Sequence, residues 1–210
     1  MPSTVSQVDI ANRALSKLGE RRIDSLAEEG NAPETLNDMF GIVRDSELEA
    51  HPWAFSKTRV QLTDDPTTPV FGYSYRYRKP SDFVRLIQVG DTPVLWAAAG
   101  IQYSYFPASE AGAPAYEIEG DFILTDYGAP LDVIYGRRET DTTLYPPTFV
   151  EAFATRLAFE ACQKITGEAA LRDRLASDYV DTIRLARRTN AIVRPPRQLP
   201  PPSWITSRLR

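Results

Sequence analysis

Apolar residues recur at helical spacing near both ends of the chain, and a segment with strand-type alternation separates them. In residues 1–52, the first apolar series is Val8, Ala11, Leu15 and Leu18. Spacings of three and four place such residues on one face of a helix. A pair of short amphipathic helices does not bury its apolar faces alone. We therefore expect the two ends of the chain to pack against each other around the inserted segment.

Each N-terminal helix has recognisable end signals. Thr4 and Gln7 have the spacing of a capping box, and Gly19 suits the residue that follows a helix. Asn31 is expected to cap the second helix, with Pro33 in its first turn. The sequence thus predicts two helices before residue 52.

Runs of strand length, separated by proline and glycine, follow from residue 53. Tyr73, Tyr75 and Tyr77 alternate with polar residues, so we expect their rings on one face, packed into a small β core. Further strands are expected at residues 83–89, 101–106, 116–119, 122–125 and 131–135. These patterns indicate an antiparallel β module.

Helical spacing returns after residue 145. Residues 146–165 and 168–190 predict two more helices, the first followed by Gly167. Residues 191–210 contain five prolines and no glycine. We interpret this last segment as an extended tail with a reach of roughly 60 Å.

The sequence therefore predicts an α+β protein. Its four-helix α domain would combine two N-terminal and two C-terminal helices, with a small antiparallel β domain inserted between the pairs and an extended C-terminal tail. We expect the N-terminal helices in residues 1–52, the β domain in 53–140, the C-terminal helices in 141–190 and a partner-binding tail in 191–210.

The chain has one histidine and one cysteine, so few classes of catalytic or metal site are open to it. A single cysteine excludes an internal disulfide and a thiol-rich zinc site. Cys162 lies beside an expected apolar stripe and is interpreted as a small core residue, and His51 as a group that binds free carbonyls at a helix end. No cofactor or metal is expected, and no apolar run is long enough to cross a membrane.

Paired carboxylates offer one alternative function. Glu117 and Glu119 lie two residues apart on an expected strand, so their side chains share a face at a separation of about 7 Å. Glycoside hydrolases use acid–base pairs at such distances. A cell-wall glycan hydrolase that uses Glu117 with Glu119 or Asp121 is therefore one alternative function. Strand surfaces often carry such pairs, however, and we do not expect an enzyme.

Charge is unevenly distributed along the chain. The net charge is −4, yet residues 184–210 contain seven arginines and no acidic residue. Apolar side chains stand among these arginines, and tryptophan and arginine are common anchors of protein interfaces. The residues expected to bind a partner protein are Arg194, Arg197, Leu199, Trp204, Ile205 and Leu209. A nucleic-acid-binding module that works through this basic tail is a second alternative.

Several stretches resemble a family of phage proteins. Residues 10–19 (IANRALSKLG), 23–26 (IDSL) and 51–56 (HPWAFS) are similar to the opening of tail tubular protein A, the head-to-tail adaptor of short-tailed bacteriophages. Residues 75–77 (YRY) and 79–83 (KPSDF) also fit, as do the two expected closing helices. These are packing patterns, and no catalytic residue is carried over with them.

The resemblance implies a structural virion protein at the head-to-tail junction, made in the host cytoplasm. It implies a dodecameric ring of copies of this chain, bound between the portal protein and the tail nozzle, with tail fibres as a further partner. DNA would pass through the lumen without specific binding. It also implies a helical domain with an inserted β domain, in agreement with the order of elements above.

The last expected helix has a charged face that would suit contacts within such a ring. Long helices with one apolar stripe and one polar face can stand side by side and close a cyclic assembly. The residues expected to make these contacts are Arg172, Asp173, Asp178, Asp181 and Arg184.

Overall fold

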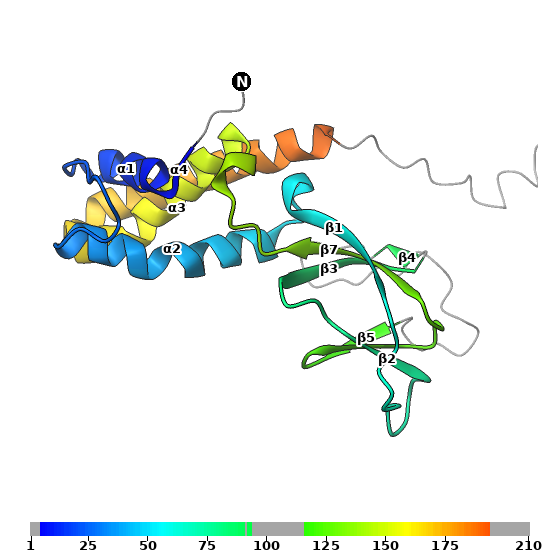
Figure 1. Cartoon of the computed structure of the whole chain (residues 1–210). Coiled ribbons are helices and arrows are strands. Elements are labelled where there is room, and N and C mark those ends of the chain that lie inside the picture. Colours follow the sequence, from blue (N-terminus) through cyan, green and yellow to red (C-terminus); the bar gives the residue numbers. More distant parts are fainter. Residues whose placement is uncertain (1–4, 91, 94–115, 194–210) are drawn as a thin grey trace, which may run out of the picture.

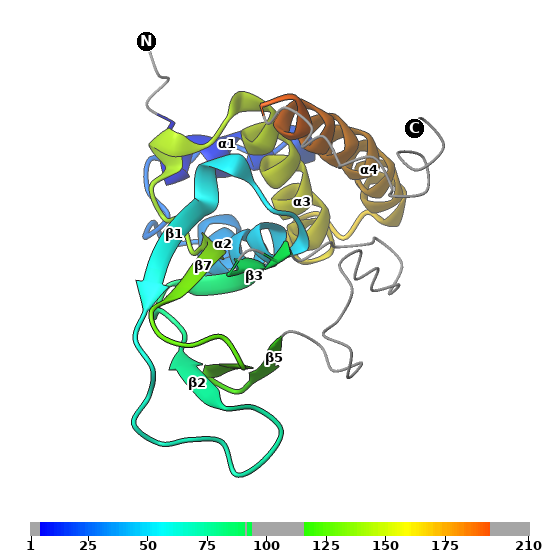
Figure 2. The same ribbon diagram turned by 90° about the vertical axis from the view of Figure 1, so that its right-hand side faces the viewer.

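Four helices and two antiparallel sheets form the part of the chain that the computed structural model describes, which is residues 5–90, 92–93 and 116–193 (Figure 1). The predicted α+β class is therefore confirmed. The helices are α1 (Gln7–Leu18), α2 (Asn31–Ala50), α3 (Pro147–Ile165) and α4 (Ala169–Ile192). Helix α3 is central, because it packs against α1, α2 and α4 (Figure 2).

Helix α1 begins with a capping box two residues later than predicted. The Ser6 hydroxyl accepts a hydrogen bond from the Asp9 backbone N–H at 3.1 Å, and the Asp9 carboxylate accepts one from the Ser6 N–H at 3.0 Å. The assignment to Thr4 and Gln7 was wrong, because aspartate fills the acceptor position as well as glutamine does. The predicted end at Gly19 is confirmed, since this residue adopts φ +75°, a conformation that glycine takes without strain.

Helix α2 starts without a side-chain cap. Gly30 occupies the N-cap position, so the prediction that Asn31 caps the helix was wrong. The Asn31 amide instead donates a hydrogen bond to the Lys164 carbonyl at 3.0 Å. This side chain therefore ties the start of α2 to the end of α3.

Helices from both ends of the chain share one core. Phe153 of α3 meets Phe40 of α2 edge to face at 5.0 Å between ring centroids, and Phe149 meets Trp53 at 4.8 Å. Cys162 is fully buried in this core, as predicted. The largest fully buried side chains of the helical part are Ile10, Leu15, Leu36, Leu48, Trp53, Phe149, Phe153 and Leu157.

The β module contains two sheets and a second, smaller core. One sheet has the order β1–β7–β3–β4 and the other β2–β6–β5, with antiparallel neighbours throughout. The strands are β1 (Lys57–Leu62), β2 (Tyr75–Arg78), β3 (Phe83–Val89), β4 (Thr92–Pro93), β5 (Tyr116–Glu119), β6 (Phe122–Thr125) and β7 (Leu131–Arg137). Strand β1 was not predicted, and the strand predicted at 101–106 lies outside the described residues.

The tyrosine strand divides between core and surface. Tyr77 is fully buried and its hydroxyl donates to the Tyr127 carbonyl at 2.8 Å, whereas Tyr75 on the same strand face is exposed. The prediction that these rings form a core face is therefore confirmed for Tyr77 and wrong for Tyr75, which is the first residue of the short strand β2.

Helix α2 and the four-stranded sheet are in contact. The Arg85 guanidinium on β3 donates to the Glu49 carbonyl at 2.7 Å, and Arg138 pairs with Asp45 at 2.9 Å.

Helix α4 continues to Ile192, two residues beyond its predicted end. The predicted tail therefore begins with helical residues, and residues 194–210 lie outside the described part.

Shortening one buried side chain of the central helix α3 should show how much the helical core contributes to stability. Leu157→Ala removes a fully buried side chain of α3 and should lower the free energy of unfolding by about 2–5 kcal/mol, because it leaves a cavity. Leu144→Ala is the matched control at a half-exposed site and should cost less than about 1 kcal/mol. Urea denaturation measures both, and equal losses would contradict the assignment of the core.

Candidate interaction surfaces and the polar junction

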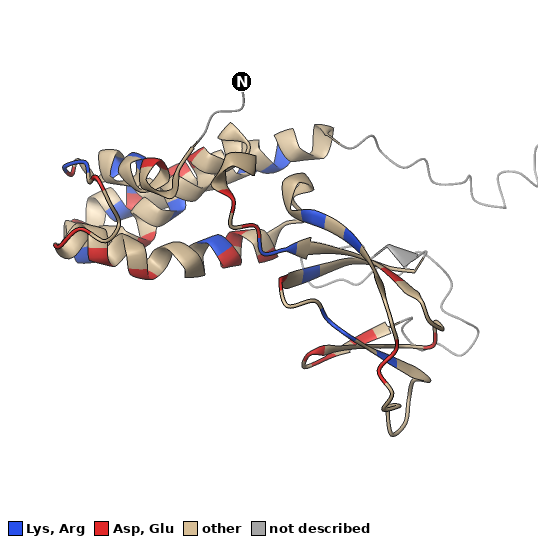
Figure 3. Ribbon diagram, viewed as in Figure 1, with Lys and Arg blue, Asp and Glu red and all other residues tan. Residues whose placement is uncertain are grey.

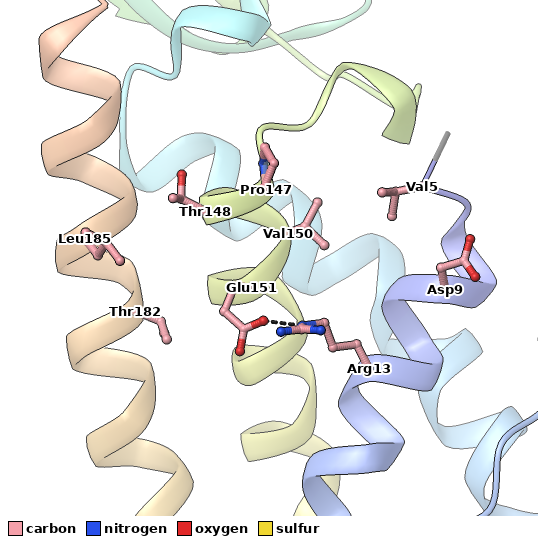
Figure 4. Close-up of a pocket in the computed structure, with 9 residues that line it drawn as sticks. All are labelled: Val5, Asp9, Arg13, Pro147, Thr148, Val150, Glu151, Thr182 and Leu185. Carbon is pink, nitrogen blue, oxygen red and sulfur yellow. Dashed lines mark hydrogen bonds and ion pairs between the residues drawn. The ribbon is translucent and has the colours of Figure 1, made fainter. Parts of the chain in front are cut away.

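A groove lies over α3, between α1 and α4 (Figure 4). Its volume is about 570 Å³. Much of its lining is apolar, and Leu185 of α4 is 57% exposed there. Helix α2 runs behind α1 and α3 in this view, and it also contacts strands β3 and β7. The lining residues that contribute carbon or methyl surface are Val5, Pro147, Thr148, Val150, Thr182 and Leu185.

An ion-pair cluster forms the polar side of the groove. Glu151 of α3 pairs with Arg13 and with Lys17 of α1, the latter at 2.6 Å. Partial burial acts to raise the pKa of Glu151, but hydrogen bonds from Lys17 and Arg13 together outweigh it and lower the pKa below its ordinary value. The cluster joins α1 to α3 and leaves the groove with a charged edge and an apolar wall.

A second exposed apolar feature lies at the far end of the molecule. The loop between β1 and β2 extends to a tip far from the helices (Figures 1 and 2). This loop includes Val70 and Phe71, which are 97% and 86% exposed. Residues 66–75 contain no charged side chain (Figure 3). A hollow of about 310 Å³ beside the tip is lined partly by Phe71 and Phe122.

Hydrogen bonds hold the base of this loop. Asp65 accepts from the Thr67 N–H at 2.9 Å and pairs with the Arg76 guanidinium at 2.6 Å. The same two contacts, the backbone one first, lower the pKa of Asp65 below its ordinary value. The Ser74 N–H donates to Asp126 at 2.9 Å on the other side of the loop. These contacts therefore hold both ends of the loop in place.

A buried polar junction lies where α2, α4 and the start of the β module meet. The Tyr179 hydroxyl of α4 donates to the Glu47 carboxylate, and the Trp53 indole N–H donates to the Glu47 carbonyl at 2.8 Å. Glu47 is 2% exposed, and burial raises the pKa of its carboxyl against the lowering effect of the Tyr179 hydroxyl. Among the described residues, the second carboxylate oxygen of Glu47 has no hydrogen-bond partner.

His51 belongs to the same junction. Its Nε2 lies 2.9 Å from the Asn190 side-chain nitrogen, and the Asn190 oxygen accepts from the Ala54 N–H at 2.8 Å. That second bond fixes the amide orientation, so the Asn190 nitrogen donates and His51 Nε2 accepts, which requires a neutral ring. His51 is the C-cap residue of α2, as predicted, but its Nε2 binds the Asn190 amide and not a free carbonyl. Burial, with help from Arg187 and Arg85, lowers the pKa of His51 to about 4.

This junction was not predicted, because its members lie far apart in the chain. Glu47 and Tyr179 occupy positions that helical periodicity assigns to apolar stripes, and Asn190 lies near the C-terminal end of α4. An acidic residue within an apolar stripe was the available signal for Glu47. Nothing in the sequence pairs Asn190 with His51.

The residues predicted to make ring contacts all belong to α4. All five are exposed, and Arg184 pairs with Asp181 at 3.1 Å within the helix. Arg172 lies over the Phe159 ring of α3 at 5.0 Å, which holds its guanidinium close to the helix surface. Their contact with a neighbouring copy stays a prediction.

The other predicted sites fall at the edges of the described structure. Glu117 and Glu119 are exposed on β5, and Asp121 is exposed in the turn that follows, so the three carboxylates border one hairpin. Glu119 also lines the hollow beside the loop tip. The predicted tail contacts lie outside the described residues: Arg194, Arg197, Leu199, Trp204, Ile205 and Leu209.

The molecule is thus an α+β protein whose described surface offers a helical groove and a projecting apolar loop. No protein-family model matches the chain, and no curated protein matches it. In the described residues, no helix is long and apolar enough to cross a membrane, and no three histidine, cysteine or acidic side chains are grouped to hold a metal ion.

Acid should weaken the fold through His51. Its folded-state pKa lies below its ordinary value of 6.5, so the unfolded chain binds the extra proton, and stability should fall as the pH drops from about 6.5 to about 4. We expect a loss of about 1–2 kcal/mol from this half-buried ring. His51→Phe keeps an aromatic ring beside Trp53 and should flatten this slope in urea titrations at each pH. An unchanged slope would contradict the role of His51.

Glu47 should show the opposite dependence. Its folded-state pKa is raised, so the unfolded chain releases the proton first, and stability is lost as the pH rises from the ordinary value of 4.5 through the folded-state pKa. Glu47→Gln should therefore gain stability relative to wild type as the pH rises from 4 to 8. Exposed Glu49→Gln is the neighbouring control, and an equal trend in both variants would count against the buried carboxyl.

Proposed function

We propose that this chain is a structural adaptor that forms a ring at the head-to-tail junction of a short-tailed bacteriophage, between the portal protein and the tail nozzle. The proposal starts from the resemblance of residues 10–19, 23–26 and 51–56 to tail tubular protein A. The ring would be a dodecamer in the virion, and DNA would pass through its lumen without specific binding.

One observation carries the proposal: the three N-terminal stretches that resemble the family, residues 10–19, 23–26 and 51–56, meet in a single buried unit. Asn12, from the first stretch, donates to the Ile23 carbonyl at 2.9 Å and accepts from the Ile23 N–H at 2.8 Å. Trp53, from the third stretch, is 1% exposed in the same helical core. The shared residues thus build a scaffold, which is what an adaptor needs from its helical domain.

The outer surface of α4 supports contacts between copies. The helix has 24 residues, with Leu175, Ile183 and Ala186 buried and charged side chains of both signs on the opposite face. Mixed charges on a rigid helix give register and specificity when identical subunits stand side by side. We propose that Arg172, Asp173, Asp178, Asp181 and Arg184 make the ring contacts.

The remaining parts would serve the other partners. The basic tail, with Arg194, Arg197, Leu199, Trp204, Ile205 and Leu209, would bind the portal or a neighbouring subunit, and many such contacts in one ring would add through multivalency. The β module would face the nozzle or the tail fibres.

Native mass spectrometry of the full chain, alone and with the portal ring of the same phage, tests the adaptor role. We expect a ring of twelve copies on the portal. The double charge reversal Asp178→Lys with Asp181→Lys should raise the concentration needed for assembly at least tenfold, because both side chains are exposed on the proposed contact face. Glu20→Lys with Glu29→Lys is the control at exposed sites outside that face.

Two outcomes would overturn the adaptor role. A chain that never assembles on the portal is not the adaptor. A chain that degrades cell-wall glycan, and loses that activity in Glu117→Gln without loss of fold, is the alternative hydrolase.

A further inference from the structure

We propose that the arginine- and proline-rich tail of one copy, residues 194–210, binds in the hollow beside the β1–β2 loop of a neighbouring copy. This contact rests on the partner-binding role proposed above for the tail, and it names the surface that the tail would bind.

The hollow lies on one face of the three-stranded sheet, and that face is ordered by charge. Directly opposite residues on antiparallel strands share a face. Strand β2 brings arginines to this face, the central strand β6 brings apolar side chains, and β5 brings glutamates. The members of the face are Arg76 and Arg78, then Phe122 and Leu124, then Glu117 and Glu119. The hollow therefore has an apolar lining from β6 and an acidic side at β5.

The acidic side lacks a counter-charge within the described residues. Arg76 already pairs with Asp65 at 2.6 Å. Glu117 and Glu119 are exposed, and neither forms an ion pair with any described residue. A positively charged occupant would supply the missing counter-charge.

The tail has the complementary charge. Residues 194–210 contain four arginines and no acidic residue, whereas six of the eight charged side chains in residues 64–78 and 116–127 are acidic. Opposite charges on two surfaces speed their encounter and fix their register. Charge complementarity thus selects this segment of the chain as the occupant.

The prolines of the tail suit the apolar part of the hollow. Five of the 17 tail residues are proline, a composition that favours the polyproline II conformation. Proline-rich segments bind grooves lined by aromatic side chains. Phe71 and Phe122 supply aromatic lining here, and Pro69 extends it. The volume of about 310 Å³ lies at the low end of the range for ligand pockets, which suits a few side chains of an extended segment.

The order of residues in the tail matches the order of the face. Polyproline II has three residues per turn, so Arg194, Arg197 and Pro200 would share one side. Two arginines at this spacing would lie roughly 9 Å apart along the segment, close to the roughly 7 Å between Glu117 and Glu119. The arginines would then pair with the two glutamates while the proline ring packs on the apolar lining.

A neighbouring copy presents the hollow. The four-stranded sheet lies between the end of α4 and the three-stranded sheet (Figures 1 and 2). Seventeen residues in polyproline II span roughly 50 Å, enough to link two molecules that stand side by side. A contact between two different surfaces of one chain repeats around a ring, and the many small contacts add through multivalency.

Binding of a labelled peptide tests the charge recognition. A fluorescent peptide of residues 194–210 should bind the full-length chain, and its dissociation constant should rise at least tenfold for Glu117→Lys with Glu119→Lys. Glu20→Lys with Glu29→Lys makes the same change in net charge at exposed sites on the helical part and should bind like wild type. All four side chains are exposed, so the unfolding midpoints should not change. Equal affinities of the two double variants would overturn the proposal.

Variants of the peptide separate a specific contact from general charge attraction. A peptide with Arg194→Ala and Arg197→Ala should bind at least fivefold more weakly than one with Arg208→Ala and Arg210→Ala, although both lose two positive charges. Equal affinities would show attraction without register and overturn the proposal.

Disulfide capture tests whether the contact joins two copies. Thr68→Cys places a thiol in the hollow and Ser203→Cys places one in the tail, while Cys162 stays buried. Mild oxidation of the mixed single variants should yield a covalent heterodimer at least ten times faster than Ser203→Cys mixed with Ile42→Cys, an exposed site on α2. Equal rates, or a double variant that cross-links only within one molecule, would overturn the contact between copies.

The adaptor role and this contact fail in different ways. Rings that form on the portal and survive Glu117→Lys with Glu119→Lys would overturn the contact and leave the adaptor role standing. Peptide binding that depends on these two glutamates, without assembly on the portal, would support the contact and overturn the adaptor role.

Discussion

Burial of α3 is the constraint on which the rest of the structure depends. A helix that is apolar on most sides must be covered on most sides. Phe149, Phe153 and Leu157 are buried along α3 together with a row of alanines, which lets α1, α2 and α4 approach closely. The two ends of the chain must therefore meet, and everything between residues 50 and 147 becomes an insertion.

The insertion is possible because the β module begins and ends at one place. Strands β1 and β7 are antiparallel neighbours, with Lys57 opposite Gly136, so the chain leaves the helices and returns to them through adjacent strands. Trp53 anchors the outgoing segment in the helical core, and the polar junction of Glu47, His51 and Asn190 surrounds that anchor. The same arrangement sends the Val70–Phe71 loop away from the helices.

Local patterns predicted the elements well where one physical rule dominated. Runs of strand length between proline and glycine marked β3, β5 and β6 at the bounds they have, and periodicity marked all four helices. Strand β1 was missed because Lys57–Leu62 mixes polar and apolar residues on a partly covered sheet. The two capping errors had different causes. Ser6, two residues after Thr4, forms the capping box with Asp9 inside the first turn, whereas the Asn31 side chain is bound by the Lys164 carbonyl at the end of α3.

The sequence by itself determined the class of fold, the order of its elements and the core character of Cys162, because these follow from the spacing of apolar residues along a single helix or strand. Only the tertiary structure decided the candidate sites. The Asn12–Ile23 clamp, the neutral His51 and the groove beside Leu185 each join residues that are distant in the chain. Their chemistry depends on distance and burial in three dimensions, which no local pattern encodes.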